Sequence, residues 1–86
     1  MSSTKQAEMA KYIIEKLEAL KTDNDNKKIL SDLKEIITNN QNIDNKELLL
    51  LSMNIVSQII DQLDDKLLIN KTIDGIINSQ KFYIKE

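Results

Sequence analysis

Residues 44–63, with the sequence DNKELLLLSMNIVSQIIDQL, form the most apolar segment of the chain, and the expected architecture is built around them. From Leu48 to Leu63 apolar side chains recur at three- and four-residue spacings, which is the period of an α-helix. Together they cover well over half of the helix circumference, which is more than one narrow buried stripe requires. We therefore expect a central helix that contacts two or more neighbouring helices.

The start of this segment carries two helix-start signals. Asp44 lies three residues before Glu47, the spacing of a capping box in which each side chain accepts the other residue's backbone N–H. Ile43 and Leu48 have the spacing of a hydrophobic staple across the same cap. The pattern predicts a helix that begins directly after Asp44.

Two helices are predicted before this segment. The first covers residues 5–20, and the second begins after Asp23, Asn24 or Asp25 and ends before a polar loop at residues 38–42. Each has one apolar stripe at helical spacing. The stripes are Ala10, Ile13, Ile14, Leu17 and Leu20 in the first helix, and Ile29, Leu30, Leu33, Ile36 and Ile37 in the second.

Three aspartates, Asp61, Asp64 and Asp65, indicate where the apolar helix ends, because the helix dipole disfavours negative charge near a C-terminus. The same cluster could hold a hard cation, but no fourth ligand can be identified nearby. A solvated helix end is the preferred interpretation.

The last part of the chain predicts a short fourth helix. Residues 67–69 are expected to form a connector, and Asn70 is expected to cap a helix over residues 71–79. Residues 74–75 (Asp-Gly) lie inside this helix and could instead form a turn, since Gly costs about 1 kcal/mol in a helix interior. Residues 80–86 are expected to form a C-terminal tail.

Short loops between amphipathic helices favour antiparallel neighbours. The predicted fold is an all-α, antiparallel four-helix bundle that forms a single domain over residues 1–86.

Missing residue types narrow the possible functions. Without His or Cys the chain lacks the commonest general base and the usual transition-metal ligands, and it has no glycine-rich phosphate loop. Every cation is Lys, the formal net charge is −2, and neither half of the chain offers a basic stripe for nucleic acid. We expect no catalytic residue, no metal site, no cofactor and no nucleic-acid partner.

Targeting signals are also absent. Residues 1–15 contain no apolar stretch of the kind found in a secretory signal, and the longest unbroken apolar run, residues 48–51, is too short for a transmembrane segment. These features predict a cytoplasmic protein without a transmembrane segment.

Phe82 and Tyr83 are two of the three aromatic residues and permit two interpretations. They could fold back to cover the open end of the bundle. Alternatively, they could be exposed anchors for a partner, since aromatic residues dominate binding hot spots.

Several segments resemble immunity proteins against pediocin-like (class IIa) bacteriocins. In the second half these are residues 51–55 (LSMNI), 68–70 (LIN) and 79–83 (SQKFY). Residues 5–8 (KQAE) and 28–33 (KILSDL) are compatible with the same family. The resemblance implies an antiparallel four-helix bundle in the cytoplasm.

The resemblance also implies a function, which is to protect the producer cell. In that family the immunity protein does not simply bind free bacteriocin. It associates, at the inner face of the membrane, with the membrane subunits of the mannose phosphotransferase receptor once bacteriocin is bound. Specificity lies in the C-terminal half, which here corresponds to residues 64–69, the fourth helix and the tail. Within that region the cationic and aromatic groups are the hypothetical partner-binding residues: Lys66, Lys71, Lys81, Phe82 and Tyr83.

The alternative is a helical adaptor or regulator that acts through homodimerisation or another protein–protein contact. The apolar third helix could serve a dimer interface as well as a core, and a dimer that buries Leu49, Met53 or Ile60 would favour this function.

Overall fold

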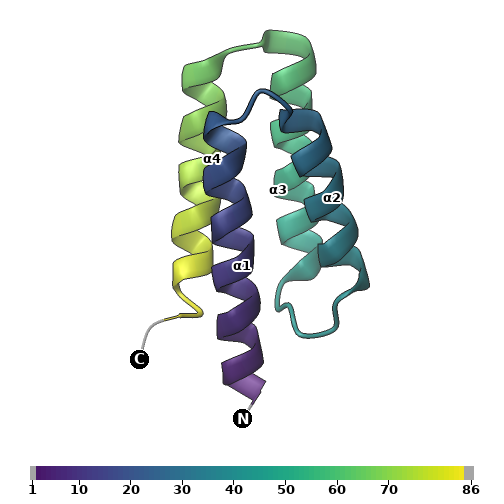
Figure 1. Ribbon diagram of the computed structural model, residues 1–86, viewed down its shortest axis with the longest axis vertical. Coiled ribbons are helices and arrows are strands. Elements are labelled where there is room, and N and C mark those ends of the chain that lie inside the picture. Colours follow the sequence, from purple (N-terminus) through teal and green to yellow (C-terminus); the bar gives the residue numbers. More distant parts are fainter. Residues whose placement is uncertain (1, 85–86) are drawn as a thin grey trace.

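Four α-helices account for most of residues 2–84, the part of the chain that this computed structural model describes (Figure 1). They are α1 (Ser2–Thr22), α2 (Asn26–Asn39), α3 (Lys46–Gln58) and α4 (Lys66–Lys81), and a π-helical turn, η1 (Ile59–Leu63), extends α3 toward α4. The described residues contain no strand, and the predicted all-α four-helix fold is confirmed.

Consecutive helices run antiparallel and form a ring of four. Each helix packs against the next helix in the chain, and α4 packs against α1 to close the ring. The connections α1–α2 and α3–α4 lie at one end of the bundle, while the start of α1 and the end of α4 lie at the other end (Figure 1).

The core is built from one aliphatic stripe on each helix and contains no aromatic side chain. Its buried apolar residues are Ala10, Ile13, Leu17 and Leu20 in α1; Leu30, Leu33 and Ile37 in α2; Leu49, Met53 and Val56 in α3; Ile59 in η1; and Ile69, Ile73, Ile76 and Ile77 in α4. In α1 and α2 they belong to the stripes expected from the sequence. In α3 the period did not distinguish the buried face from the exposed one. Periodicity therefore located only part of the core.

The fourth helix is longer than predicted. It begins at Lys66, and Asn70 lies inside it. Asp65 is the cap, because its side chain accepts a hydrogen bond from the backbone N–H of Leu68 at 3.1 Å. A carboxylate at this place satisfies an otherwise unpaired donor and also suits the positive end of the helix dipole. Gly75 has no positive φ and lies within the helix, not in a turn.

The predicted tail is partly helical. Gln80 and Lys81 belong to α4, and the next residues form a turn in which the N–H groups of Tyr83 and Ile84 donate to the carbonyls of Gln80 and Lys81, both at 3.0 Å. The prediction of a tail from residue 80 is therefore wrong for its first part. Residues 85–86 lie outside the described residues.

The predicted capping box and staple of α3 are wrong. The helix begins at Lys46, and its N-cap is Asn45, whose φ is 54° and whose side chain makes no capping hydrogen bond. Leu48 remains 63% exposed while Ile43 packs against the core, so the two do not form a staple. Asn tolerates the left-handed conformation better than most residues, which allows a sharp entry into the helix at Asn45.

The end of the apolar helix lies at the aspartates, as predicted. Asp64 adopts a left-handed conformation with φ of 49°, and its N–H donates to the carbonyl of Ile59 at 2.8 Å. The chain then needs only Asp64 and Asp65 to reach α4. Among the described residues, no three acidic side chains lie close enough together to hold a metal ion.

Substitutions at two adjacent leucines should have very different effects on the free energy of unfolding. Leu49 is 5% exposed, whereas Leu48 is 63% exposed. Leu49→Ala should lower the free energy of unfolding by about 2–4 kcal/mol, because it removes buried methyl groups and leaves a cavity. Leu48→Ala, the matched control, should change it by less than about 0.5 kcal/mol. Urea denaturation measures both, and equal losses would contradict the assignment of the buried face.

One ion pair connects the first and last helices. The Nζ of Lys21 donates to Oδ1 of Asp74 at 2.6 Å, and Oε1 of Glu18 lies 3.5 Å from the same ammonium. The hydrogen bond to Asp74 is the main reason that the pKa of Lys21 is raised above 10.5, and burial partly opposes it. Because the folded-state pKa is higher than the unfolded one, this pair stabilises the fold below pH 10.5 and loses its effect as the pH rises through the folded-state value.

Asp74→Asn tests this linkage. The variant should have a lower unfolding temperature than the wild type from pH 7 to 9, and the difference should shrink as the pH rises above 10.5. Thermal unfolding followed by circular dichroism supplies the comparison. A difference that stays constant to the highest pH would show that Asp74 stabilises the fold without Lys21.

Candidate interaction surfaces

Large exposed apolar side chains gather on one half of the described structure. Within residues 4–84, all seven of them belong to the segment from α3 to Phe82, and none lies on α1 or α2. They are Leu48, Leu51, Ile55, Leu63, Leu67, Leu68 and Phe82. The hairpin formed by α3 and α4 is therefore the part of the surface most suited to contacts with another molecule.

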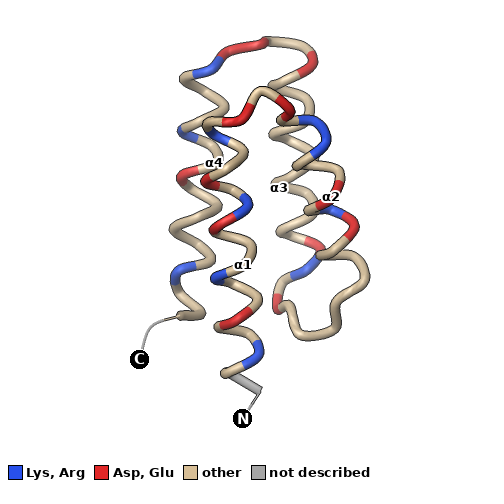
Figure 2. The backbone as a smooth tube through the Cα atoms, viewed as in Figure 1, with Lys and Arg blue, Asp and Glu red and all other residues tan. Residues whose placement is uncertain are grey.

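Charge shows the same asymmetry. Acidic and basic residues alternate along α1 and α2, whereas residues 48–60 contain no charged residue (Figure 2). As expected, α3 contacts two neighbouring helices, α2 and α4. Its apolar surface is only partly covered, because Leu48, Leu51 and Ile55 form an exposed ridge on α3 (the "α3 ridge").

A groove of about 310 Å³ runs between α3 and α4, the two neighbouring helices that approach each other least closely. Leu48, Ser52 and Ile55 line its α3 side. The α4 side is lined by small residues at one-turn spacing, Thr72, Gly75 and Ser79. None of the lining residues is charged. We call this feature the "α3–α4 groove".

The end of the groove near the chain terminus carries polar groups. There Nδ2 of Asn45 donates to the hydroxyl oxygen of Tyr83 at 2.7 Å, so the start of α3 is tied to the residues after α4. Gln80 also lines the groove and is only 5% exposed.

Gly75 is not required by the internal packing of the bundle. Its φ is not positive, and a Cβ placed on it would have no neighbour within 4 Å. Glycine in a helix interior is less favourable than alanine by roughly 0.5–1 kcal/mol. The groove is therefore unfilled at Gly75, a residue that lowers the stability of α4.

The lysines predicted to bind a partner are all exposed. Lys66, Lys71 and Lys81 form no ion pair within residues 2–84, in contrast to Lys21 and Lys27, which pair with acidic groups of neighbouring helices. Fifteen residues separate Lys66 from Lys81, so they lie about 22 Å apart along α4. The structure thus places these lysines along one helix and not in a compact cluster.

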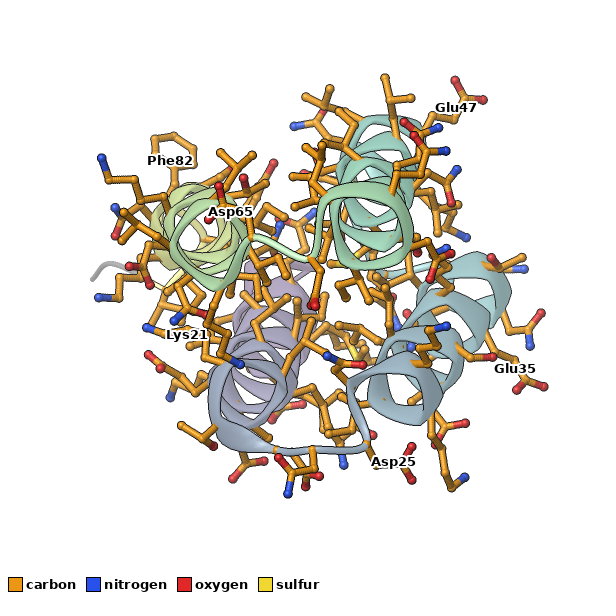
Figure 3. The ribbon with its side chains drawn as sticks, turned by 90° about the horizontal axis from the view of Figure 1, so that it is seen from above. Lys21, Asp25, Glu35, Glu47, Asp65 and Phe82 are labelled. Atoms are coloured by element: carbon orange, nitrogen blue, oxygen red, sulfur yellow. The ribbon has the colours of Figure 1, made fainter. Side chains whose placement is uncertain are left out.

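The two aromatic residues behave differently from each other. Phe82 is 64% exposed and points outward from the end of α4 (Figure 3). Tyr83 is half-buried, bonds to Asn45 and contacts Phe82 edge-to-face, with the ring centroids 5.6 Å apart. Of the two interpretations, Tyr83 follows the covering role and Phe82 the exposed one.

Of the three residues named for a dimer interface, Leu49 and Met53 are buried in the core, whereas Ile60 packs against the core and is partly buried. If α3 contacts another molecule, it does so through the α3 ridge on its opposite side.

No helix among residues 2–84 combines the length and apolar character needed to span a lipid bilayer.

Gly75→Ala should stabilise the protein, because the methyl group enters open space and alanine loses less backbone entropy on folding. The expected gain in the free energy of unfolding is about 0.5–1 kcal/mol. Urea denaturation at low protein concentration measures it. A loss of stability would mean that the groove is closed in the folded protein.

Comparison with models of known families, with curated proteins and with solved structures finds no match for this chain.

Proposed function

We propose that this chain is an immunity protein against a pediocin-like bacteriocin. It acts without catalysis, by binding the bacteriocin-engaged membrane subunits of the mannose phosphotransferase receptor from the cytoplasmic side. Two features support the proposal. The segments quoted from the sequence resemble that family, and the four antiparallel helices are the fold that the resemblance implies.

The outer face of α4 is the observation that carries the proposal. At 100° per residue, Lys71 and Phe82 lie about 20° apart on the helix surface, and Leu67 lies about 40° from Lys71. Leu67 is 70% exposed, Phe82 is 64% exposed, and Lys71 is exposed without an ion pair among residues 2–84. These residues lie on one side of α4 (the "α4 face"), with Asn78 between Lys71 and Phe82 along the helix.

This composition suits a membrane-embedded partner. Lysine places an apolar stem against hydrocarbon and a charge in water, and aromatic rings favour the membrane–water boundary. The cytoplasmic leaflet also carries negative charge, which attracts lysines near its surface. Lys66 and Lys81 are also exposed and lie at the two ends of α4.

Protection of cells is the direct test. A strain sensitive to pediocin-like bacteriocins should, when it expresses this chain, survive at least one bacteriocin of a panel that kills the same strain carrying an empty vector. Cells that keep the protein in the cytoplasm should survive, because the proposed binding takes place on that side of the membrane. A correctly expressed protein that protects against none of the panel would contradict the proposal.

Variants locate the site. Lys71→Gln with Lys81→Gln should lower the protective effect about tenfold, since two partner contacts of roughly 0.5–1 kcal/mol each are lost. Lys5→Gln with Lys11→Gln is the matched control, because these lysines are also exposed but lie on α1.

Phe82→Ala should reduce protection without changing the unfolding temperature, because the ring is mostly exposed. Equal protection by the wild type, the double lysine variant of α4 and Phe82→Ala would remove the α4 face from the site.

A further inference from the structure

We propose that the α3–α4 groove binds a second copy of this chain, with the α3 ridge of each copy seated in the groove of the other. This contact goes beyond the proposed immunity function. At 100° per residue, Gly75 lies about 40° from Lys71 and about 20° from Phe82, so the groove borders the α4 face.

The hairpin carries a ridge and a groove side by side. Leu48, Leu51 and Ile55 recur at helical spacing, so they form a continuous ridge that can enter a neighbouring groove. A two-fold dimer uses the same patch on both partners and therefore requires a self-complementary patch. A ridge beside a groove of similar length meets that requirement.

Charge permits the contact. Two copies that approach through α3 bring together segments with no charged residue from 48 to 60. No like charges face each other along this stretch, in either direction of approach. On α1 and α2, by contrast, charged residues recur along each helix (Figure 2).

The available area indicates a small interface. Because α3 has 13 residues, the face shared by α3 and α4 is about 20 Å long and about 20 Å wide. A face of this size is smaller than the roughly 800 Å² that each partner buries in a standard interface, so a weak dimer is expected.

Gly75 has no role inside one copy. It meets neither a conformational nor an internal packing requirement, but small residues on a helix allow another helix to approach closely. A second chain supplies the close neighbour.

Sedimentation equilibrium of the full chain over about 1 μM to 1 mM tests the proposal. The average mass should rise from 9.9 kDa toward twice that value. A monomer at every concentration, or assembly into species larger than a dimer, would overturn it.

Point variants identify the surface. Leu51→Glu should raise the Kd at least tenfold, while Leu67→Glu, which alters a similarly exposed leucine outside the groove, should leave it unchanged. Gly75→Leu places a side chain in the groove and improves helix propensity, so it should give a folded monomer. The reverse pattern, with dimerisation lost only in Leu67→Glu, would overturn the assignment.

Disulfide cross-linking tests the proposed dimer contact directly, without variants that weaken it. The chain has no cysteine, so Leu51→Cys mixed with Ser79→Cys reports only on the introduced thiols. Oxidation should yield the mixed disulfide in excess over a mixture of Leu51→Cys with Lys5→Cys. Equal yields from both mixtures would count against the proposed arrangement.

Discussion

The four helices of this protein must share a single aliphatic core, and this constraint determines most of the structure. In a chain of this size folding hides only about 60–65% of the surface, so each helix has to contribute its whole stripe. The stripe of α1 closes against α4, and the stripe of α2 closes against α3. Since the buried set contains neither an aromatic ring nor a charged group, the fold depends on the shape of branched and straight aliphatic side chains.

The same constraint explains why the surface is uneven. The core accepts one stripe from α3, formed by Leu49, Met53 and Val56, but α3 is apolar around most of its circumference. The apolar residues that remain cannot reach the core and become the α3 ridge. Helices α1 and α2 have charged residues at the equivalent positions, so their outer faces are ordinary solvated surfaces.

Periodicity predicted the helices well. Their ends were harder to predict, because neighbouring residues compete as N-caps. Asp65 and Asn70 are both good N-caps, and the choice of Asp65 adds a turn that places Ile69 in the core. Asp44 and Asn45 compete in the same way at the start of α3, where a left-handed residue is needed and asparagine tolerates it.

Part of the candidate surface was predictable. The exposure of Lys66, Lys71 and Lys81 followed from their charge, but the contrast between Phe82 and Tyr83 depended on Asn45, which is far away in the sequence. The α3–α4 groove was missed, although the sequence carried a signal for it. Thr72, Gly75 and Ser79 share one face of α4. Small residues on one face leave unfilled space between that helix and its neighbour.

The most direct test of the central claim is the solvent accessibility of leucine methyl groups, measured by NMR with a soluble paramagnetic probe. At a concentration where the chain is monomeric, the methyl signals of Leu17, Leu33 and Leu49 should be protected. Those of Leu63 and Leu67 should broaden strongly, because these side chains are 62% and 70% exposed. If Leu49 broadened as much as Leu67, the buried face of α3 would be assigned wrongly, and the shared aliphatic core would be contradicted.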